Sequence, residues 1–131
     1  MNPNVAFMQG MYAAFNRGDM PVVTKHFTPD CEWIYEGPGE VAYFGRRRGH
    51  EEIANFFETM ARKETGHKLE MTHFVAEGDT VAAFGRFTAT SKSTGRTFSV
   101  PMAHLVRIRD GKIYHHQALA DTHAVAGAHR A

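Results

Sequence analysis

The chain has 131 residues, 43% of them hydrophobic and 22% charged, with a formal net charge of +1. This length fits a single domain over residues 1–131 with a sizeable core, and the nearly balanced charge argues against a nucleic-acid partner. The single cysteine, Cys31, excludes an internal disulfide and favours a reducing, cytoplasmic location. The N-terminus lacks the pattern of a signal peptide, and no run approaches the ~20 apolar residues of a membrane helix.

Helices dominate the first half of the chain. Residues 3–17 carry apolar side chains at helical spacing after Pro3, which suits a first helical turn. A short second helix is expected over residues 20–27, and a third over about 50–63. A short strand over residues 31–35 and a glycine-rich loop separate the second helix from the third.

Four strands are predicted after the third helix. The helical period disappears, and residues 69–76, 80–90, 97–109 and 112–120 alternate as strands do, with turn residues between them. The tail after residue 120 forms a last helical turn or frays. Helices followed by a meander of strands predict an α+β fold, in which three helices cover one face of a mainly antiparallel sheet.

The last hairpin carries the most informative side chains. An Asp110-Gly111 pair between two strands is typical of a tight type I′ turn, and in that register His104 faces Gln117. His104 and Asp121 then lie roughly 13 Å apart along the strand, so they would act from different sides of a ligand. Because side chains alternate along a strand, one largely apolar face is expected to carry Met102, His104, Gln117, Leu119 and Asp121.

The order of these elements resembles a known family. An N-R-G-D sequence follows the first helix, Trp33 lies in the first strand, and D-G-K-I precedes a strand that ends at Asp121. Over nearly the whole chain this is similar to the SnoaL-like group of the nuclear transport factor two-like superfamily. The resemblance implies a cone-shaped roll enclosing a pocket, with frequent dimerisation through the outer sheet face. Members include polyketide cyclases, ketosteroid isomerases, epoxide hydrolases and binding proteins, so the fold does not determine the function.

The enzymes of this superfamily differ in their carboxylates. Tyr35 and Ala103 occupy the positions of the two isomerase aspartates, so steroid isomerase chemistry is not expected. The epoxide hydrolase pattern matches at Arg86 and Asp121, but Thr88 replaces its second carboxylate. The resemblance to SnoaL-type cyclases implies that one aspartate at the end of the last strand transfers protons, and Asp121 matches that position.

Three residues are predicted to be catalytic. Asp121 would be an acid/base group, since an apolar cavity raises the pKa of a carboxyl; the alternative is that it caps the tail. His104 would be a base, a relay or a hydrogen-bond donor, or else a core histidine bonded to Gln117. Arg86 would orient Asp121 or bind a substrate oxygen, or else face water. Substrate contacts are predicted at Tyr12, Trp33, Tyr35, Phe56, Met60, Phe84, Thr88, Met102, Gln117 and Leu119. Ordinary core packing is the alternative for the first five.

The expected function is cofactor-independent acid/base chemistry, of the isomerase, cyclase or lyase type, on an apolar carbonyl or polyketide-like compound. No metal site is predicted, because neighbouring residues such as His115 and His116 point to opposite faces of a strand. One alternative is a non-catalytic ligand-binding protein, which a closed cavity with Asp121 on the surface would favour. Another is a variant epoxide hydrolase. A homodimer is expected through an outer sheet face formed by Val81, Ala83, Phe87 and Leu105.

Overall fold

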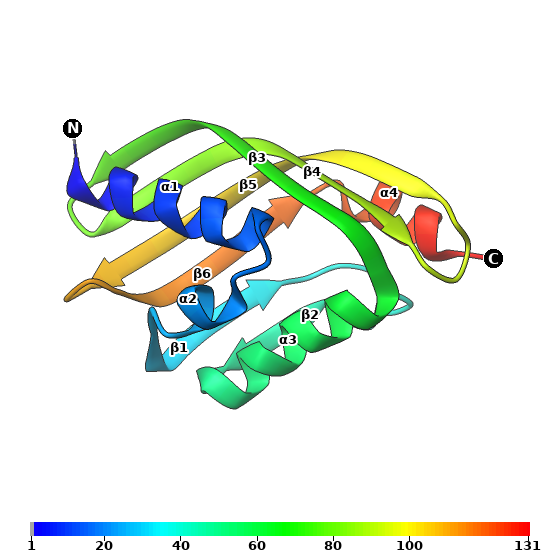
Figure 1. The fold of residues 1–131 in the computed structure, drawn as a ribbon, viewed down its shortest axis with the longest axis horizontal. Helices are drawn as coiled ribbons and strands as arrows, with labels where there is room; N and C mark the ends of the chain where they lie inside the picture. Colours follow the sequence, from blue (N-terminus) through cyan, green and yellow to red (C-terminus); the bar gives the residue numbers. More distant parts are fainter. Residues whose placement is uncertain (1) are drawn as a thin grey trace.

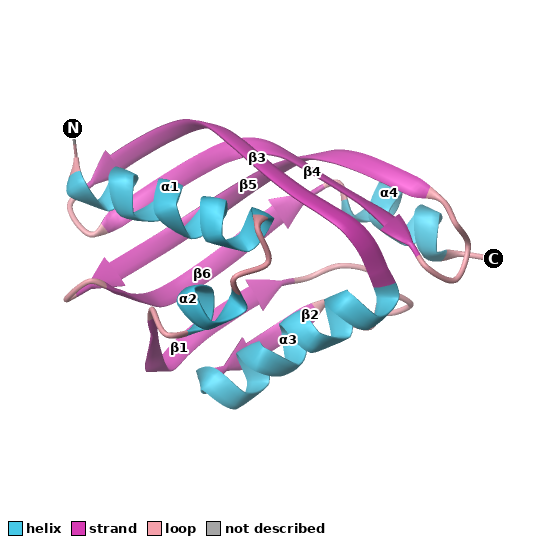
Figure 2. Ribbon diagram, viewed as in Figure 1, coloured by secondary structure: helices cyan, strands magenta, loops and turns pink. Residues whose placement is uncertain are grey.

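A computed structural model describes residues 2–131 as four helices and one six-stranded sheet (Figures 1 and 2). The helices are α1 (Pro3–Asn16), α2 (Met20–Thr24), α3 (Gly49–Lys63) and α4 (Thr122–His129). The strands are β1 (Phe27–Tyr35), β2 (Gly45–Arg48), β3 (Glu64–Glu77), β4 (Thr80–Ser91), β5 (Thr97–Arg109) and β6 (Lys112–Ala120). The predicted α+β class is confirmed.

The sheet has the strand order β2-β1-β6-β5-β4-β3 and is not closed into a barrel. All neighbouring strands are antiparallel except β1 and β6, which run parallel. Helices α1, α2 and α3 lie over one face of this curved sheet, where α1 contacts β3 and α3 contacts β1 (Figure 1). Helix α1 therefore covers the β3 side of this face, and α3 covers the side formed by β1 and β2.

Local sequence signals explain where the main helices begin and end. The Asn2 side chain accepts a hydrogen bond of 2.8 Å from the Asn4 backbone N–H, and Pro3 occupies the first turn of α1. In α3, acidic residues in the first turn and basic residues in the last turn complement the helix dipole. The apolar side of α3 is buried against the sheet through Ile53, Phe56 and Met60.

Several boundaries differ from the prediction. Helix α2 ends at Thr24, and β1 begins at Phe27, four residues earlier than expected. Strand β2 was not predicted, since its Gly-Arg-Arg-Arg sequence has no apolar alternation; backbone pairing with β1 forms it, and its outward arginines, Arg46 and Arg48, lie near Glu36 and Glu32. A short, charged edge strand of this kind resists pairing with other chains.

The last hairpin has the predicted turn but not the predicted register. Asp110 and Gly111 have φ values of 53° and 72°, as a type I′ turn requires, and Arg109 pairs with Lys112. The register then shifts by one, because Ile108 pairs with Ile113 whereas Arg107 pairs with His115. Tyr114 is therefore the extra residue of a β-bulge, and every residue after it on β6 points to the face opposite the predicted one.

The outer face of the sheet also differs from the prediction. Val81, Ala83 and Phe87 are buried in the core, so they cannot contribute to an interface. Their neighbours on β4 face outward instead. One row of paired residues crosses three strands through Phe84, Ala103 and Leu119, and the side chains of Phe84 and Leu119 are exposed.

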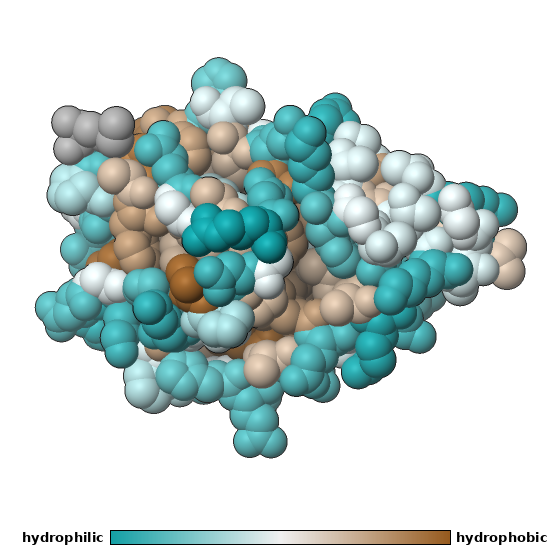
Figure 3. Space-filling model, in the orientation of Figure 1, coloured by the Kyte–Doolittle hydropathy of each residue, from teal (hydrophilic) through white to brown (hydrophobic). Residues whose placement is uncertain are grey.

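No helix within residues 2–131 combines the length and the apolar character that crossing a membrane requires. In space-filling form, the helical side of the molecule shows apolar residues between the helices, bordered by hydrophilic ones (Figure 3).

Candidate functional site

A cavity lies between the helices and the inner face of the sheet. The cavity has a volume of about 70 Å³. No aspartate, glutamate, lysine or arginine of the described chain lines the cavity. Its wall is mostly aromatic and aliphatic, and it includes four methionines, Met8, Met11, Met60 and Met102. Methionine side chains are flexible and adapt to different shapes, so the wall can yield to a ligand larger than the unliganded space.

A hydrogen-bonded pair forms the polar centre of the cavity. Tyr12 comes from α1 and His104 from β5, and the Tyr12 hydroxyl lies 2.9 Å from His104 Nδ1. Burial lowers the pKa of His104 to about 3, because the low-dielectric interior disfavours the charged imidazolium. Burial likewise raises the pKa of Tyr12. Both groups are therefore neutral at pH 7, and either nitrogen of His104 can carry the hydrogen, depending on the tautomer.

A second histidine lies beside this pair. The His116 ring is 4.5 Å from the His104 ring and stacks on the Trp33 indole at 3.9 Å, centroid to centroid. The Tyr114 bulge turns His116 inward, and parallel pairing of β1 with β6 places it opposite Trp33. Burial lowers the pKa of His116 well below its ordinary value, and the nearby His104 lowers it further. The cavity thus contains two adjacent neutral imidazoles.

Three buried polar atoms of the cavity wall have no hydrogen-bonding partner in the protein: Trp33 Nε1, the Tyr35 hydroxyl and His116 Nδ1. Buried polar groups in folded proteins are nearly always hydrogen-bonded, and leaving one unbonded costs about 1–3 kcal/mol. Trp33 N–H can only donate. A bound molecule that completes this site must therefore offer at least one acceptor, such as an oxygen atom.

Seven of the predicted site residues meet at this cavity: Tyr12, Trp33, Tyr35, Phe56, Met60, Met102 and His104. Helical spacing in α1 and α3, and strand alternation in β1 and β5, identify all seven. The inward direction of each of these side chains follows from the spacing of apolar residues within its own helix or strand.

The other six predicted residues lie outside the cavity. Asp121 is exposed, and its side chain caps α4 by accepting a hydrogen bond of 3.1 Å from the Ala124 N–H. Gln117 and Leu119 point to the outer face because of the bulge. On β4, Phe84, Arg86 and Thr88 also face outward, and the last two bond to Ser99. Arg86 and Asp121, the two residues that match the epoxide hydrolase pattern, both lie outside the cavity, so they cannot act on a molecule bound there.

Among the cavity residues outside the predicted set, His116 is the one with a polar side chain, and one buried carboxylate was also missed. His116 was assigned to the outer face, and only knowledge of the bulge could have corrected this. Glu64, the first residue of β3, was left in the connection after α3, yet its side chain is fully buried. The sequence signal for Glu64 is weak, since a glutamate near the end of a helix is usually exposed.

Comparisons with known proteins agree with this architecture. A family model for the SnoaL-like domain matches residues 8–116. A nuclear transport factor 2-like protein of unknown function from Burkholderia pseudomallei is 23% identical, with a TM-score of 0.90 and 100% of both chains covered. TerC, co-crystallised with polyporic acid, is 29% identical, with a TM-score of 0.89, covering 99% of this chain and 100% of TerC.

A Pseudomonas putida protein with a provisional polyketide cyclase designation is 22% identical, with a TM-score of 0.75, and the match covers 93% of this chain and 94% of that one. At this identity the likeness concerns the fold alone. No protein of curated function matches the sequence significantly. Because the SnoaL-like model matches far more than half of the chain, the chain belongs to the SnoaL-like domain family.

Proposed function

We propose that the protein is a cofactor-independent acid/base enzyme that acts on an uncharged, apolar carbonyl or polyketide-like compound, with His104 as the proton-accepting group. The observation that carries the proposal is the Tyr12–His104 hydrogen bond inside an apolar cavity. Burial keeps the imidazole neutral. If Nδ1–H donates to the Tyr12 oxygen, the lone pair of Nε2 is free to accept a proton.

The charge of the wall supports an uncharged ligand. A carboxylate or an ammonium group in this cavity would find no opposite charge among the lining residues, and burying an unpaired charge is costly. The unpartnered donors of Trp33 and Tyr35 favour a ligand with oxygen acceptors. A planar, mostly apolar compound with carbonyl or hydroxyl groups satisfies both conditions.

The proposed step is removal of a proton from the carbon next to a carbonyl group. His104 Nε2 takes the proton, the C–H electron pair forms the new carbon–carbon double bond, and the negative charge moves to the carbonyl oxygen. Forming imidazolium here costs about 5 kcal/mol more than in water. The enolate that forms at the same moment offsets this cost, and hydrogen bonds from Trp33 or Tyr35 to its oxygen stabilise it. Return of the proton to another carbon completes an isomerisation. In a ring closure the enolate carbon instead bonds to a second carbonyl carbon of the substrate, whose C=O electron pair moves to its oxygen, and the proton returns to that oxygen.

TerC gives this proposal a first ligand to examine, because it is 29% identical over its whole length and was co-crystallised with polyporic acid. A cavity without charged side chains would take this acid in its protonated, uncharged form, so binding should strengthen as the pH is lowered. The unliganded space of about 70 Å³ is less than half the 150 Å³ of a cavity that admits benzene. We therefore expect the flexible methionines of the wall to move when polyporic acid binds.

Proton exchange tests the proposal without knowledge of the true substrate. A panel of uncharged cyclic ketones, each with a C–H group next to the carbonyl, would be incubated with the protein in D₂O, and loss of that C–H signal would be followed by NMR. Replacing His104 with Gln should slow the catalysed exchange about 10²-fold or more. The matched control is His123→Gln, a substitution at an exposed histidine of α4, which should exchange at the wild-type rate. Equal rates in the wild type and His104→Gln would overturn the assignment.

A non-catalytic ligand-binding protein is the second candidate. Two observations favour it: the unliganded cavity is small, and Asp121 caps a helix on the surface. Polyporic acid should then quench the fluorescence of Trp33, the single tryptophan of the chain, while no compound of the panel exchanges protons faster than in buffer. Catalysed exchange of any compound would exclude this candidate.

We also propose that two copies of the chain associate through the outer sheet face. The residues that support this are not those expected from the sequence, since only Leu105 of that set lies on the outer side. The row formed by Phe84, Ala103 and Leu119 is apolar and runs across three strands. Exposed apolar surface of this kind usually marks an interface.

A further inference from the structure

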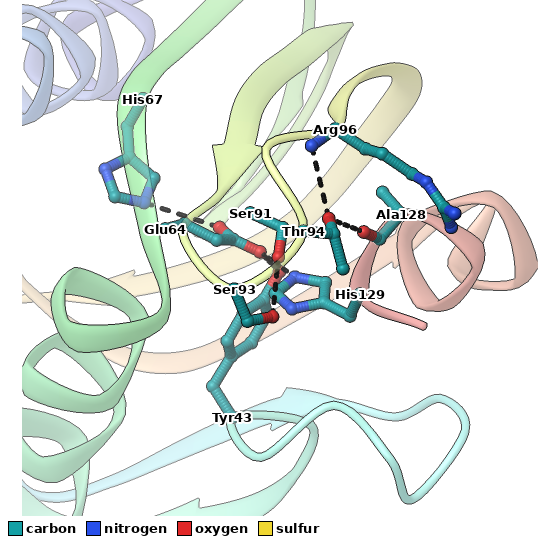
Figure 4. A network of polar contacts seen from close by, with 9 residues as sticks. All are labelled: Tyr43, Glu64, His67, Ser91, Ser93, Thr94, Arg96, Ala128 and His129. Atoms are coloured by element: carbon teal, nitrogen blue, oxygen red, sulfur yellow. Dashed lines mark hydrogen bonds and ion pairs between the residues drawn. The ribbon is translucent and has the colours of Figure 1, made fainter. Parts of the chain in front are cut away.

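One buried carboxylate of the described chain lies outside the cavity. Glu64 begins β3, and its side chain is completely buried. The Tyr43 hydroxyl donates to Glu64 Oε2 at 2.6 Å, and His129 Nε2 lies 2.6 Å from the same oxygen. His67 Nε2 approaches the other oxygen, Oε1, at 3.4 Å. Figure 4 shows these side chains converging on Glu64 from three directions.

The Glu64 cluster, formed by Tyr43, Glu64, His67 and His129, joins three segments that are far apart in the sequence. Tyr43 comes from the connection between β1 and β2, Glu64 and His67 from the start of β3, and His129 from the end of α4. Helix α4 has only eight residues, too few to be stable without tertiary contacts. Thr94 also holds it, by donating a hydrogen bond of 2.6 Å to the Ala128 carbonyl (Figure 4).

The cluster lies directly behind one wall of the cavity. The centre of the Tyr43 ring lies 6.0 Å from that of Tyr35 and 5.6 Å from that of Phe56. The His67 ring stacks on Phe87 with 6.0 Å between the ring centres. Tyr35, Phe56 and Phe87 all line the cavity. Burial raises the pKa of Tyr35, and the charge of Glu64 raises it further, so the Glu64 cluster and the Tyr35 hydroxyl of the cavity wall are electrostatically coupled.

We propose that Glu64 is a positioning residue: its carboxylate holds Tyr43 and His129 in place, and through Tyr43 it fixes Tyr35 and Phe56 in the cavity wall. Glu64 acts on the wall and does not touch a ligand. Its effect on ligand binding rests on the proposed function, whereas its effect on Tyr35 and α4 does not.

The experiment compares Glu64→Ala, Glu64→Gln and the control Glu58→Ala, in which an exposed glutamate of α3 is truncated. Tyrosine labelled with ¹³C at Cζ reports on Tyr35 by NMR, and hydrogen exchange reports on the α4 amides. Glu64→Ala should shift the Tyr35 resonance, accelerate α4 exchange at least about tenfold and weaken polyporic acid binding about tenfold. Glu64→Gln keeps an oxygen that accepts from Tyr43, so it should restore most of the Tyr35 signal and the affinity.

Tyr43→Phe keeps the test decisive if Glu64→Ala does not fold. It removes a single hydroxyl, so it should shift the Tyr35 resonance and leave α4 exchange at the wild-type rate. An unchanged Tyr35 resonance in Tyr43→Phe, or Glu64→Gln behaving like Glu64→Ala, would overturn the positioning role. If wild-type protein does not bind polyporic acid, the choice of ligand fails, and the Tyr35 and α4 measurements still decide whether Glu64 positions the wall.

Discussion

The buried His104 makes a specific prediction about acid stability. Its pKa is about 3 in the folded protein and near 6.5 in an unfolded chain. Between these two values the unfolded state binds a proton that the folded state does not, so the free energy of unfolding falls as the pH falls. The stabilisation is fully present above pH 6.5 and is lost progressively toward pH 3.

The size of the effect follows from the two pKa values. At pH 5 the folded imidazole is still neutral and the unfolded one is mostly charged, so His104 alone lowers the free energy of unfolding by about 2 kcal/mol relative to pH 8. His116 is shifted in the same direction and adds its own loss. Replacing His104 with Gln removes only the first contribution.

Urea unfolding at pH 8, 7, 6 and 5, followed by Trp33 fluorescence, measures the difference. Glutamine also loses the imidazole's contact with Tyr12, but that cost does not depend on pH. The wild-type free energy of unfolding should therefore fall about 2 kcal/mol further than that of His104→Gln between pH 8 and pH 5. His123→Gln, at an exposed position, should follow the wild type. Parallel profiles for the wild type and His104→Gln would refute the claim that His104 is buried and neutral.

Four further substitutions, at three positions, examine the fold and the surface. Asp121→Ala should lower the free energy of unfolding by about 1 kcal/mol, because α4 loses its N-terminal cap. Asp121→Asn keeps a good capping residue, so it should change neither the stability nor the rate of catalysed proton exchange. Loss of catalysed exchange in Asp121→Asn would show that Asp121 takes part in the chemistry. Gly85→Ala places a methyl group against the Glu70 carbonyl and should cost about 3 kcal/mol in urea unfolding; a wild-type midpoint would contradict this close approach. Leu119→Glu puts a charge into the outer-face row next to Ala103, so sedimentation should show a monomer under conditions in which the wild type forms the proposed dimer.

What the sequence predicts well is set by local periodicity. The spacing of Tyr12, Phe56 and Met60 on helices, and of Trp33 and Tyr35 on β1, is sufficient to direct all five to the cavity. The Asp110-Gly111 turn is likewise a local signal, because few residue pairs adopt positive φ at both positions. The α+β class follows from the order of such elements.

The remaining site residues depend on information that is not local. On β4 both faces carry apolar residues, Val81 and Ala83 on one side and Ala82 and Phe84 on the other, so alternation alone does not identify the inner face. The face to which the β6 side chains point depends on a single bulge at Tyr114, and no residue type in the sequence indicates that bulge. Burial of Glu64 depends on Tyr43 and His129, which are brought together only by the completed fold.

The bulge at Tyr114 also has a consequence for redesign of the cavity. Removing that one residue would leave Ile113 opposite Ile108, His115 opposite Arg107 and His116 opposite Val106, so β6 would keep its inward side chains in a continuous register. A change that instead paired Tyr114 with Arg107 would turn the strand over along its remaining length, bringing His115, Gln117 and Leu119 to the cavity face and taking His116 away from it. The side chains that β6 gives the cavity therefore depend on whether one residue is left out of the strand pairing, so related proteins with and without the bulge need not share a site even where their residues align.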